Sequence, residues 1–384
     1  MENEFIPFSL PDIGEEEINE VADTLQSGWI TTGPKTKVFE SDFQKFIGSD
    51  VMAIAVNSAT AGLHLALEAL GVSKGDEVIV PTLTFTATAE VVRYVDADIK
   101  FADVNPKTLN IDIDSIRKII TPNTKVIMVM HYAGLSCDMD EILLLAKEYN
   151  LKVVEDAAHA LPTFYKGKMI GSLQSDVSVF SFYANKTMTT GEGGMVVTRN
   201  SSLGKRMKIM RLHGIDKEPF DRFQTKKISW YYEVVAAGFK YNLTDIASSM
   251  GIHQLKKLPK FLERRQYLAK RYFDSLRSLP LILPEDDCNG GSHSWHLFVI
   301  RLKDNVKMNR DELILFLRNK GIGTSVHYVP LHRHPYWCER YKLTNSMFPF
   351  ADKAYVNMVS IPLYTAMSDK HQDRVIQALH DALG

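Results

Sequence analysis

The sequence predicts an α/β protein with a large domain on a mostly parallel sheet and a smaller C-terminal α/β domain. Short apolar runs alternate with helical patterns through the first two thirds of the 384 residues, as in sheets that helices cover on both faces. The run 126–130 (VIMVM) is apolar throughout, which is typical of a buried parallel strand. The pattern changes after a long helical stretch, so we place the domains at residues 1–250 and 251–384.

The expected elements follow from hydrophobic periodicity. Seven strands of the large sheet are expected at 52–57, 77–80, 99–103, 125–131, 152–156, 176–182 and 194–198. Helices are expected at 15–26, 60–70, 86–95, 112–120 and 138–149. The helical stretch 245–276 contains Pro259, which lacks a backbone N–H, so we expect an interruption there. In the smaller domain we expect a strand at 293–302 and helices at 310–320 and 370–383.

Composition argues against a nucleic-acid-binding, membrane-spanning or disulfide-rich protein. Lysine and arginine number 45 against 46 acidic residues, so net charge gives no reason to expect nucleic acid or an anionic membrane as partner. The three cysteines are odd in number and widely spaced, which favours a reducing compartment over a disulfide framework. We find neither a signal-peptide pattern nor an apolar run of about 18 residues, and therefore expect a cytoplasmic protein without a membrane span.

Three places at the ends of expected strands carry residues suited to chemistry, and ligands bind at such ends in open α/β sheets. The first is the run from Ser58 to Gly62, where small residues and Thr60 precede a helix. The N–H groups of a helix N-terminus attract an anion. A plain helix cap by Ser58 or Thr60 explains the same residues.

The second and third places are Asp156 and Lys186. A carboxylate at a strand end can hold the protonated ring nitrogen of pyridoxal phosphate (PLP), although a helix cap is an alternative. Lys186 follows a buried strand, where desolvation would lower its pKa for Schiff-base chemistry. An exposed loop lysine is the alternative. Ser181, on the same segment, could bind a phosphate. The order of the three places is that of fold-type I aminotransferases.

The sequence resembles the DegT/StrS group of sugar aminotransferases over essentially its whole length. The stretches that carry the resemblance are SGWITTGP (27–34), VNSATAGLHLAL (56–67), GDEVIVPTLTFTATA (75–89), HYAGLSCDMD (131–140), VVEDAAHA (153–160), FSFYANKTMTTGEGGMVVT (180–198) and GFKYNLTDIAS (238–248). The resemblance implies the fold of the type I PLP-dependent transferases and a homodimer with active sites at its interface.

The resemblance also implies roles for individual residues. Lys186 would hold PLP as a Schiff base and then act as general acid/base, and Asp156 would pair with the pyridine nitrogen. Further positions that it assigns to the cofactor are Thr60, Ala61 and Ser181 at the phosphate, Phe85 and His159 beside the ring, and Asn242 at the phosphate of the neighbouring subunit.

The reaction implied is transfer of an amino group from L-glutamate to carbon 4 of a UDP- or dTDP-linked 4-keto-sugar, with pyridoxamine phosphate as intermediate. The wording ANKTMTTGEGG also resembles GDP-perosamine-type enzymes, and a carbon-3 aminotransferase is a further alternative. Related sugar dehydratases carry histidine in place of the lysine, and Lys186 argues against that branch. An enzyme acting on free amino acids and a non-catalytic regulator with the same fold are the rival classes.

Several other polar residues are candidates for contacts with the substrate. Gly28 and Gly33 nearly match a phosphate-binding loop, but Pro34 stands where the lysine belongs. That segment could instead form a surface turn or contact the substrate. The candidates are Trp29, Thr31, Arg211, His213, His327 and Tyr328, with Lys226 or Lys227 in the charged stretch 216–232.

Three histidines and a cysteine lie close together in the smaller domain. They are His327, His332, His334 and Cys338. Their spacing matches no established zinc site, and we expect no metal.

Overall fold

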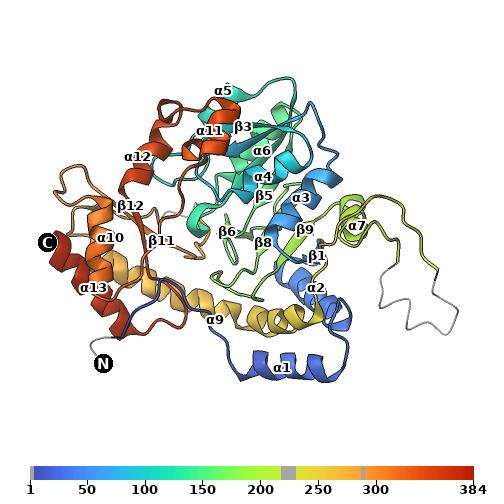
Figure 1. The fold of residues 1–384 in the computed structure, drawn as a ribbon, viewed down its shortest axis with the longest axis horizontal. Helices are drawn as coiled ribbons and strands as arrows, with labels where there is room; N and C mark the ends of the chain where they lie inside the picture. The colour runs from blue at the N-terminus through green and yellow to red at the C-terminus, as the bar shows by residue number, and fades with distance from the viewer. Residues whose placement is uncertain (1–3, 218–230, 287–289) are drawn as a thin grey trace.

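The computed structural model describes residues 4–217, 231–286 and 290–384. A seven-stranded sheet runs in the order β1-β9-β8-β5-β4-β2-β3 (Figure 1). Every neighbouring pair is parallel except the two that involve β9. This confirms the seven predicted strands and the mostly parallel sheet. The bounds are β1 Met52–Val56, β2 Glu77–Pro81, β3 Asp98–Ala102, β4 Thr124–Met130, β5 Lys152–Asp156, β8 Val177–Ser181 and β9 Gly194–Thr198.

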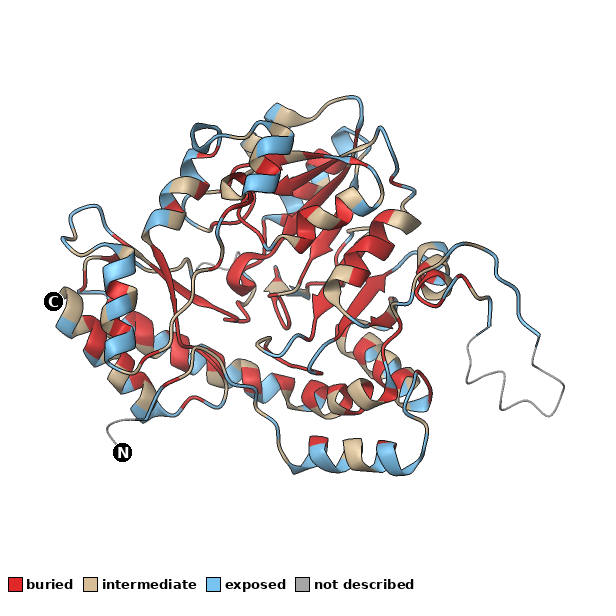
Figure 2. Cartoon of the chain, viewed as in Figure 1, coloured by how far each residue is buried: buried red, intermediate tan, exposed pale blue. Residues whose placement is uncertain are grey.

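Helices cover both faces of this sheet, and β4 shows why its sequence is apolar throughout. Val126, Met128 and Met130 belong to the core shared with helices α3, α4 and α7. Ile127 and Val129 belong to the core on the other face, shared with α2, α5, α6 and the first half of α9. Figure 2 shows the buried residues gathered along the strands and the helix faces turned towards them. The bounds are α2 Pro34–Ile47, α3 Ala59–Ala69, α4 Ala87–Tyr94, α5 Ile113–Ile119, α6 Met139–Glu148, α7 Ser201–Met210 and α9 Asp245–Leu276.

A smaller antiparallel sheet, β10-β11-β12, has its own core with α10, α13 and the second half of α9. Ile6 belongs to the same core, so the N-terminal segment reaches this sheet. The predicted domain boundary between residues 250 and 251 falls near the start of α9 and stays a prediction. The remaining bounds are α1 Glu15–Gln26, β6 Phe164–Tyr165, β7 Lys168–Met169, β10 Leu281–Ile282, β11 Phe298–Leu302, α10 Arg310–Asn319, α11 Pro335–Tyr341, α12 Pro349–Asn357, β12 Met358–Ile361 and α13 Asp369–Leu383.

The expected interruption of the long helix near Pro259 is wrong. Helix α9 continues through Pro259 over 32 residues. A proline inside a helix costs about 3 kcal/mol. Packing on both sides of it offsets this cost, because the first half of α9 packs on α1 and α2 and the second half on α13. In the described part of the chain no helix is both long and apolar enough to cross a membrane.

The N-terminus of α2, just after Gly33, binds a carboxylate of the protein itself. Asp245 is fully buried and accepts hydrogen bonds from the backbone N–H groups of Gly33 (2.8 Å), Lys35 (3.0 Å) and Thr36 (2.9 Å). The Thr36 hydroxyl donates a fourth at 2.7 Å. A carboxylate at this position also complements the helix dipole. The segment around Gly28 and Gly33 therefore fastens α2 to α9.

Replacing Asp245 with alanine should lower the free energy of unfolding by about 3 kcal/mol, because it leaves buried donors without an acceptor. Asp245→Asn keeps the shape and one acceptor oxygen and should lose less. Thermal unfolding of the two variants and the parent protein measures the effect. Equal unfolding temperatures for alanine variant and parent would contradict this account of the contact.

Candidate active site

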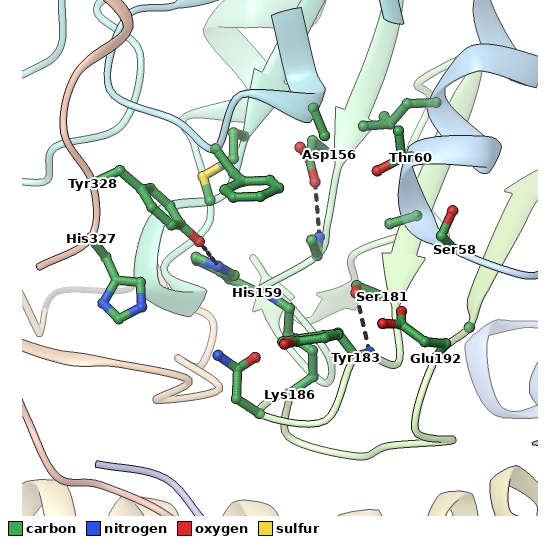
Figure 3. A pocket seen from close by; sticks show the side chains of 18 residues that line it. Ser58, Thr60, Asp156, His159, Ser181, Tyr183, Lys186, Glu192, His327 and Tyr328 are labelled. Atoms are coloured by element: carbon green, nitrogen blue, oxygen red, sulfur yellow. Dashed lines mark hydrogen bonds between the residues drawn. The ribbon is translucent and has the colours of Figure 1, made fainter. Parts of the chain in front are cut away.

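A cavity of about 510 Å³ opens at the edge of the large sheet where its parallel strands end. Its walls come from the loops after β1, β2, β5 and β8, from the start of β9, and from the segment of the smaller domain that carries His327 and Tyr328. Figure 3 shows these side chains converging on one space. The topology thus brings together residues that lie far apart in the sequence.

Lys186 lies in the turn that follows β8, with its backbone N–H donating to the carbonyl of Tyr183 at 2.9 Å. Its side chain lines the cavity. Burial lowers the pKa of the Lys186 amine from its usual 10.5 to about 8, although the nearby charge of Asp156 acts in the opposite direction. A substantial fraction of the amine is then neutral near physiological pH, as a nucleophile that attacks an aldehyde must be.

Asp156, the last residue of β5, presents its carboxylate to the same cavity. Its Oδ2 accepts from the Thr88 hydroxyl at 2.7 Å and its Oδ1 from the Ala158 N–H at 3.1 Å. Burial nevertheless raises the pKa of Asp156. A buried carboxylate in this condition is stabilised by a cationic ligand, such as a protonated ring nitrogen.

The start of α3 combines a helix cap with an open anion position. Ser58 caps the helix by accepting the Ala61 N–H at 3.1 Å, which confirms the capping interpretation. That bond occupies the Ala61 N–H, and Ala61 does not line the cavity. Thr60 and Ser181 do line it, on facing segments. The first N–H groups of the helix and these two hydroxyls form a site suited to a phosphate.

Gly194 allows β9 to approach the start of α3. A Cβ at this position would lie 2.8 Å from the backbone nitrogen of Ala59 and 2.8 Å from the carbonyl oxygen of Phe180. Both atoms are backbone, so neither can move without shifting α3 or β8. Gly194 therefore fixes the geometry of the anion position.

Gly194→Ala should weaken binding of a phosphate-bearing cofactor by roughly tenfold or more, since overpacking at backbone contacts costs about 1–3 kcal/mol. Titration of the cofactor-free variant with PLP, followed by absorbance, checks this. Unchanged affinity together with an unchanged fold would show that the approach of β9 does not shape the phosphate position.

His159, which follows β5, and Tyr328, from the smaller domain, meet in the wall of the cavity. The Tyr328 hydroxyl lies 2.8 Å from His159 Nε2. Burial keeps the pKa of His159 well below its usual value, and the positive charge of Lys186 acts in the same direction. Phe85, which is 54% exposed, lies with its ring 5.7 Å from that of Tyr328. A neutral imidazole and two aromatic rings thus line the same cavity as Asp156.

Comparison with known protein families matches residues 11–380 to the DegT/DnrJ/EryC1/StrS aminotransferase family. The chain belongs to this family. It is 44% identical over 381 residues to the spore coat polysaccharide biosynthesis protein SpsC of Bacillus subtilis, covering 99% of this chain and 97% of that one. It is 46% identical over 376 residues to an uncharacterized protein of Methanocaldococcus jannaschii, with 98% and 97% covered.

Solved structures of sugar aminotransferases have the same fold. A putative sugar aminotransferase from Streptococcus pneumoniae, in its PMP form, superposes with a TM-score of 0.91 at 35% identity, with 98% of each chain covered. The aminotransferase PseC of Helicobacter pylori gives a TM-score of 0.90 at 27% identity, with 99% of each chain covered. The fold is that of the type I PLP-dependent transferases, as predicted.

PLP is the cofactor of this family, and the streptococcal protein is solved in both PLP and PMP forms. The residues of this chain fit it on three observations. Lys186 has a lowered pKa, Asp156 is a buried carboxylate with a raised pKa, and the start of α3 with Thr60 and Ser181 offers a phosphate position. The three features line one cavity, as the three parts of the cofactor require.

Other predicted site residues lie elsewhere in the chain. Arg211 does not face the cavity, because its buried guanidinium contacts Glu40 and donates to the Ala55 carbonyl at 2.7 Å. That expectation is wrong for this chain. Asn242 is buried and donates to Thr32 at 2.6 Å, so its role towards a neighbouring subunit stays a prediction. Also outside the cavity lining are Trp29, Thr31 and His213, while Lys226 and Lys227 fall outside the described residues.

Four polar residues of the site escaped the sequence analysis. Tyr183, Asn185 and Glu192 line the cavity, and Thr88 holds Asp156. Glu192 lies within the stretch 180–198, which carries the family resemblance. Thr88 is three residues after Phe85, on the first turn of α4, and that spacing could have indicated a second inward side chain.

The histidines of the smaller domain do not gather around a metal position. Among the described residues, no group of three or more histidine, cysteine, aspartate or glutamate side chains is arranged to bind a metal ion. His327 lines the cavity, whereas His332 is buried outside the cavity lining and His334 is half-buried. Cys338 donates to the His332 carbonyl at 2.7 Å.

Proposed function

We propose that this aminotransferase moves an amino group from L-glutamate to carbon 4 of a UDP- or dTDP-linked 4-keto-sugar, in the cytoplasm. The observation that carries the proposal is the juxtaposition of Lys186, Asp156 and the phosphate position in one cavity. We further propose that it acts as a homodimer with its active sites at the interface. There, Trp29, Thr31 and His213 would contact the substrate, and Asn242 would contact the phosphate of the neighbouring subunit.

The residues of the cavity have different tasks. When bound, PLP supplies the electron sink that stabilises the carbanion formed during amino transfer. Asp156 would accept a hydrogen bond from the ring nitrogen and would keep it protonated. Lys186 would hold the cofactor through its amine, and the same Nζ would carry the proton that moves during amino transfer. His159, kept neutral by burial, would orient the ring, and Tyr328 would orient His159.

A sugar substrate is supported by the relatives. SpsC is named as a protein of spore coat polysaccharide biosynthesis, and PseC as an aminotransferase involved in the biosynthesis of pseudoaminic acid. We infer that this chain likewise serves the synthesis of an amino sugar for a surface polysaccharide. A GDP-linked substrate and amination at carbon 3 are the alternatives to be separated by experiment.

The test presents the protein, loaded with PLP and L-glutamate, with UDP-, dTDP- and GDP-linked 4-keto-sugars and a 3-keto-sugar, and locates the new amine by NMR. We expect a UDP- or dTDP-linked 4-amino product. A 3-amino or GDP-linked product would replace the proposed substrate by an alternative. Turnover with 2-oxo acids alone would contradict a sugar aminotransferase.

A further inference from the structure

A segment of the smaller domain, residues 327–334, crosses to the large sheet and carries His327 and Tyr328 over the cavity. It is fastened just after β2. The Leu331 N–H donates to the Thr82 carbonyl at 2.8 Å, and the Thr82 hydroxyl lies 2.8 Å from His332 Nδ1. Thr82 is fully buried and His332 is 1% exposed, so water does not compete for this bond.

The other side of the His332 ring contacts helix α12. His332 Nε2 lies 3.3 Å from Asp352 Oδ1, which also accepts from Arg333 Nε at 2.7 Å. A carboxylate can only accept, so Nε2 carries the proton and Nδ1 accepts from the Thr82 hydroxyl. Burial lowers the pKa of His332, which favours this neutral tautomer. Phe348 stacks on the ring with centroids 4.8 Å apart.

Helix α12 is itself fixed to the large sheet. Asp103, which follows β3, accepts from the backbone N–H groups of Phe350 at 3.0 Å and Ala351 at 2.9 Å, at the first turn of the helix. The backbone of α12 beside Asp352 is therefore held by Asp103, in addition to the contacts that the Asp352 side chain makes with the segment 327–334. His332 connects two points that are both anchored at the sheet edge, Thr82 directly and Asp352 through the start of α12.

Tyr328 lies four residues before His332, and its hydroxyl lies 2.8 Å from His159. We propose that His332 is a positioning residue of the active site, holding Tyr328 against His159 through its contacts with Thr82 and Asp352. His332 does not line the cavity, so it acts through Tyr328 and not on bound molecules. The inference rests on PLP binding in this cavity and holds for any amino acceptor.

The test measures PLP binding to the cofactor-free protein in a double-mutant cycle. His332→Gln should weaken PLP binding about tenfold, the effect of one lost buried hydrogen bond. In a Tyr328→Phe background, His332→Gln should lower PLP affinity by less than about twofold, because the contact between the Tyr328 hydroxyl and His159 is already absent. At saturating PLP, the rate at which L-glutamate bleaches the cofactor band should change by less than the affinity.

Two further variants keep the result interpretable. Thr82→Val removes only the hydroxyl and should reproduce the pattern if His332→Gln fails to fold. His253→Gln is the matched control, because His253 pairs with Glu20 at 2.9 Å and does not line the cavity; it should leave PLP affinity unchanged. Equal losses of affinity with and without Tyr328, or unchanged affinity in both His332 and Thr82 variants, would overturn the inference. A parent protein that binds PLP but aminates no sugar would refute the proposed function alone.

Discussion

Replacing Lys186 with alanine is expected to reduce amino transfer by at least about 10⁴-fold, because the chain loses both its nucleophile and its proton carrier in one step. Lys186 is the cavity-lining lysine that approaches Asp156, and burial brings its pKa to about 8. No lysine elsewhere on the cavity wall, as far as the structure describes it, can substitute for it. Single-turnover reactions with L-glutamate measure the loss.

The control for this variant is Lys45→Ala, since the side chain of that lysine is 71% exposed and pairs with Asp42 on its own helix. It should retain parental activity. The Lys186 variant should also release its cofactor on gel filtration, whereas the parent protein retains it. An alanine variant that transfers amino groups at near parental rate would contradict the role of Lys186 as nucleophile and proton carrier.

The second large effect is expected for Asp156→Asn. An amide cannot hold the ring nitrogen in its protonated state, so activity should fall on the order of 10³-fold. The side chain keeps its size and can still contact Thr88, so cofactor retention should be affected much less than turnover. Steady-state kinetics beside a PLP titration separates the two quantities. A variant with parental kcat would contradict the role of Asp156 as the ring partner.

The same substitution should have the opposite effect on the stability of the cofactor-free protein. Burial raises the pKa of Asp156 above its usual 3.8, so the folded state favours the protonated carboxyl. Stability from this group is fully present below pH 3.8 and is lost as the pH rises through the folded-state pKa. At neutral pH the asparagine variant should therefore unfold at a higher temperature than the parent, and the difference should shrink at acidic pH. A less stable asparagine variant at neutral pH would contradict this.

Much of the fold could be predicted because its buried parallel strands correspond to short apolar runs in the sequence. Residues 126–130 are all apolar because their side chains point alternately to the two faces of β4, and both faces are buried. Pro259 misled the prediction because its local cost is offset by tertiary packing, which no local pattern reveals. The strand expected from 293 begins only at Phe298, since the backbone turns at Trp295, which has a φ of 51°.

The candidate site divides in the same way. Lys186, Asp156 and Ser181 follow strands directly, so their motifs reveal them. Arg211 was misassigned because a buried pair with Glu40, 171 residues away in sequence, cannot be seen locally. Thr82, His332 and Asp352 meet only through the packing of α12 against the large sheet, so their connection required the structure.

The most direct measurement is the visible absorption spectrum of the PLP-loaded protein before and after addition of L-glutamate. The account predicts a yellow band from the lysine-bound cofactor that bleaches as the amino group is transferred, and that a keto-sugar nucleotide then restores. The Lys186→Ala variant should show no such band. A protein that forms no lysine-bound band, or whose band L-glutamate leaves unchanged, would contradict the central claim that Lys186 and Asp156 form an aminotransferase site.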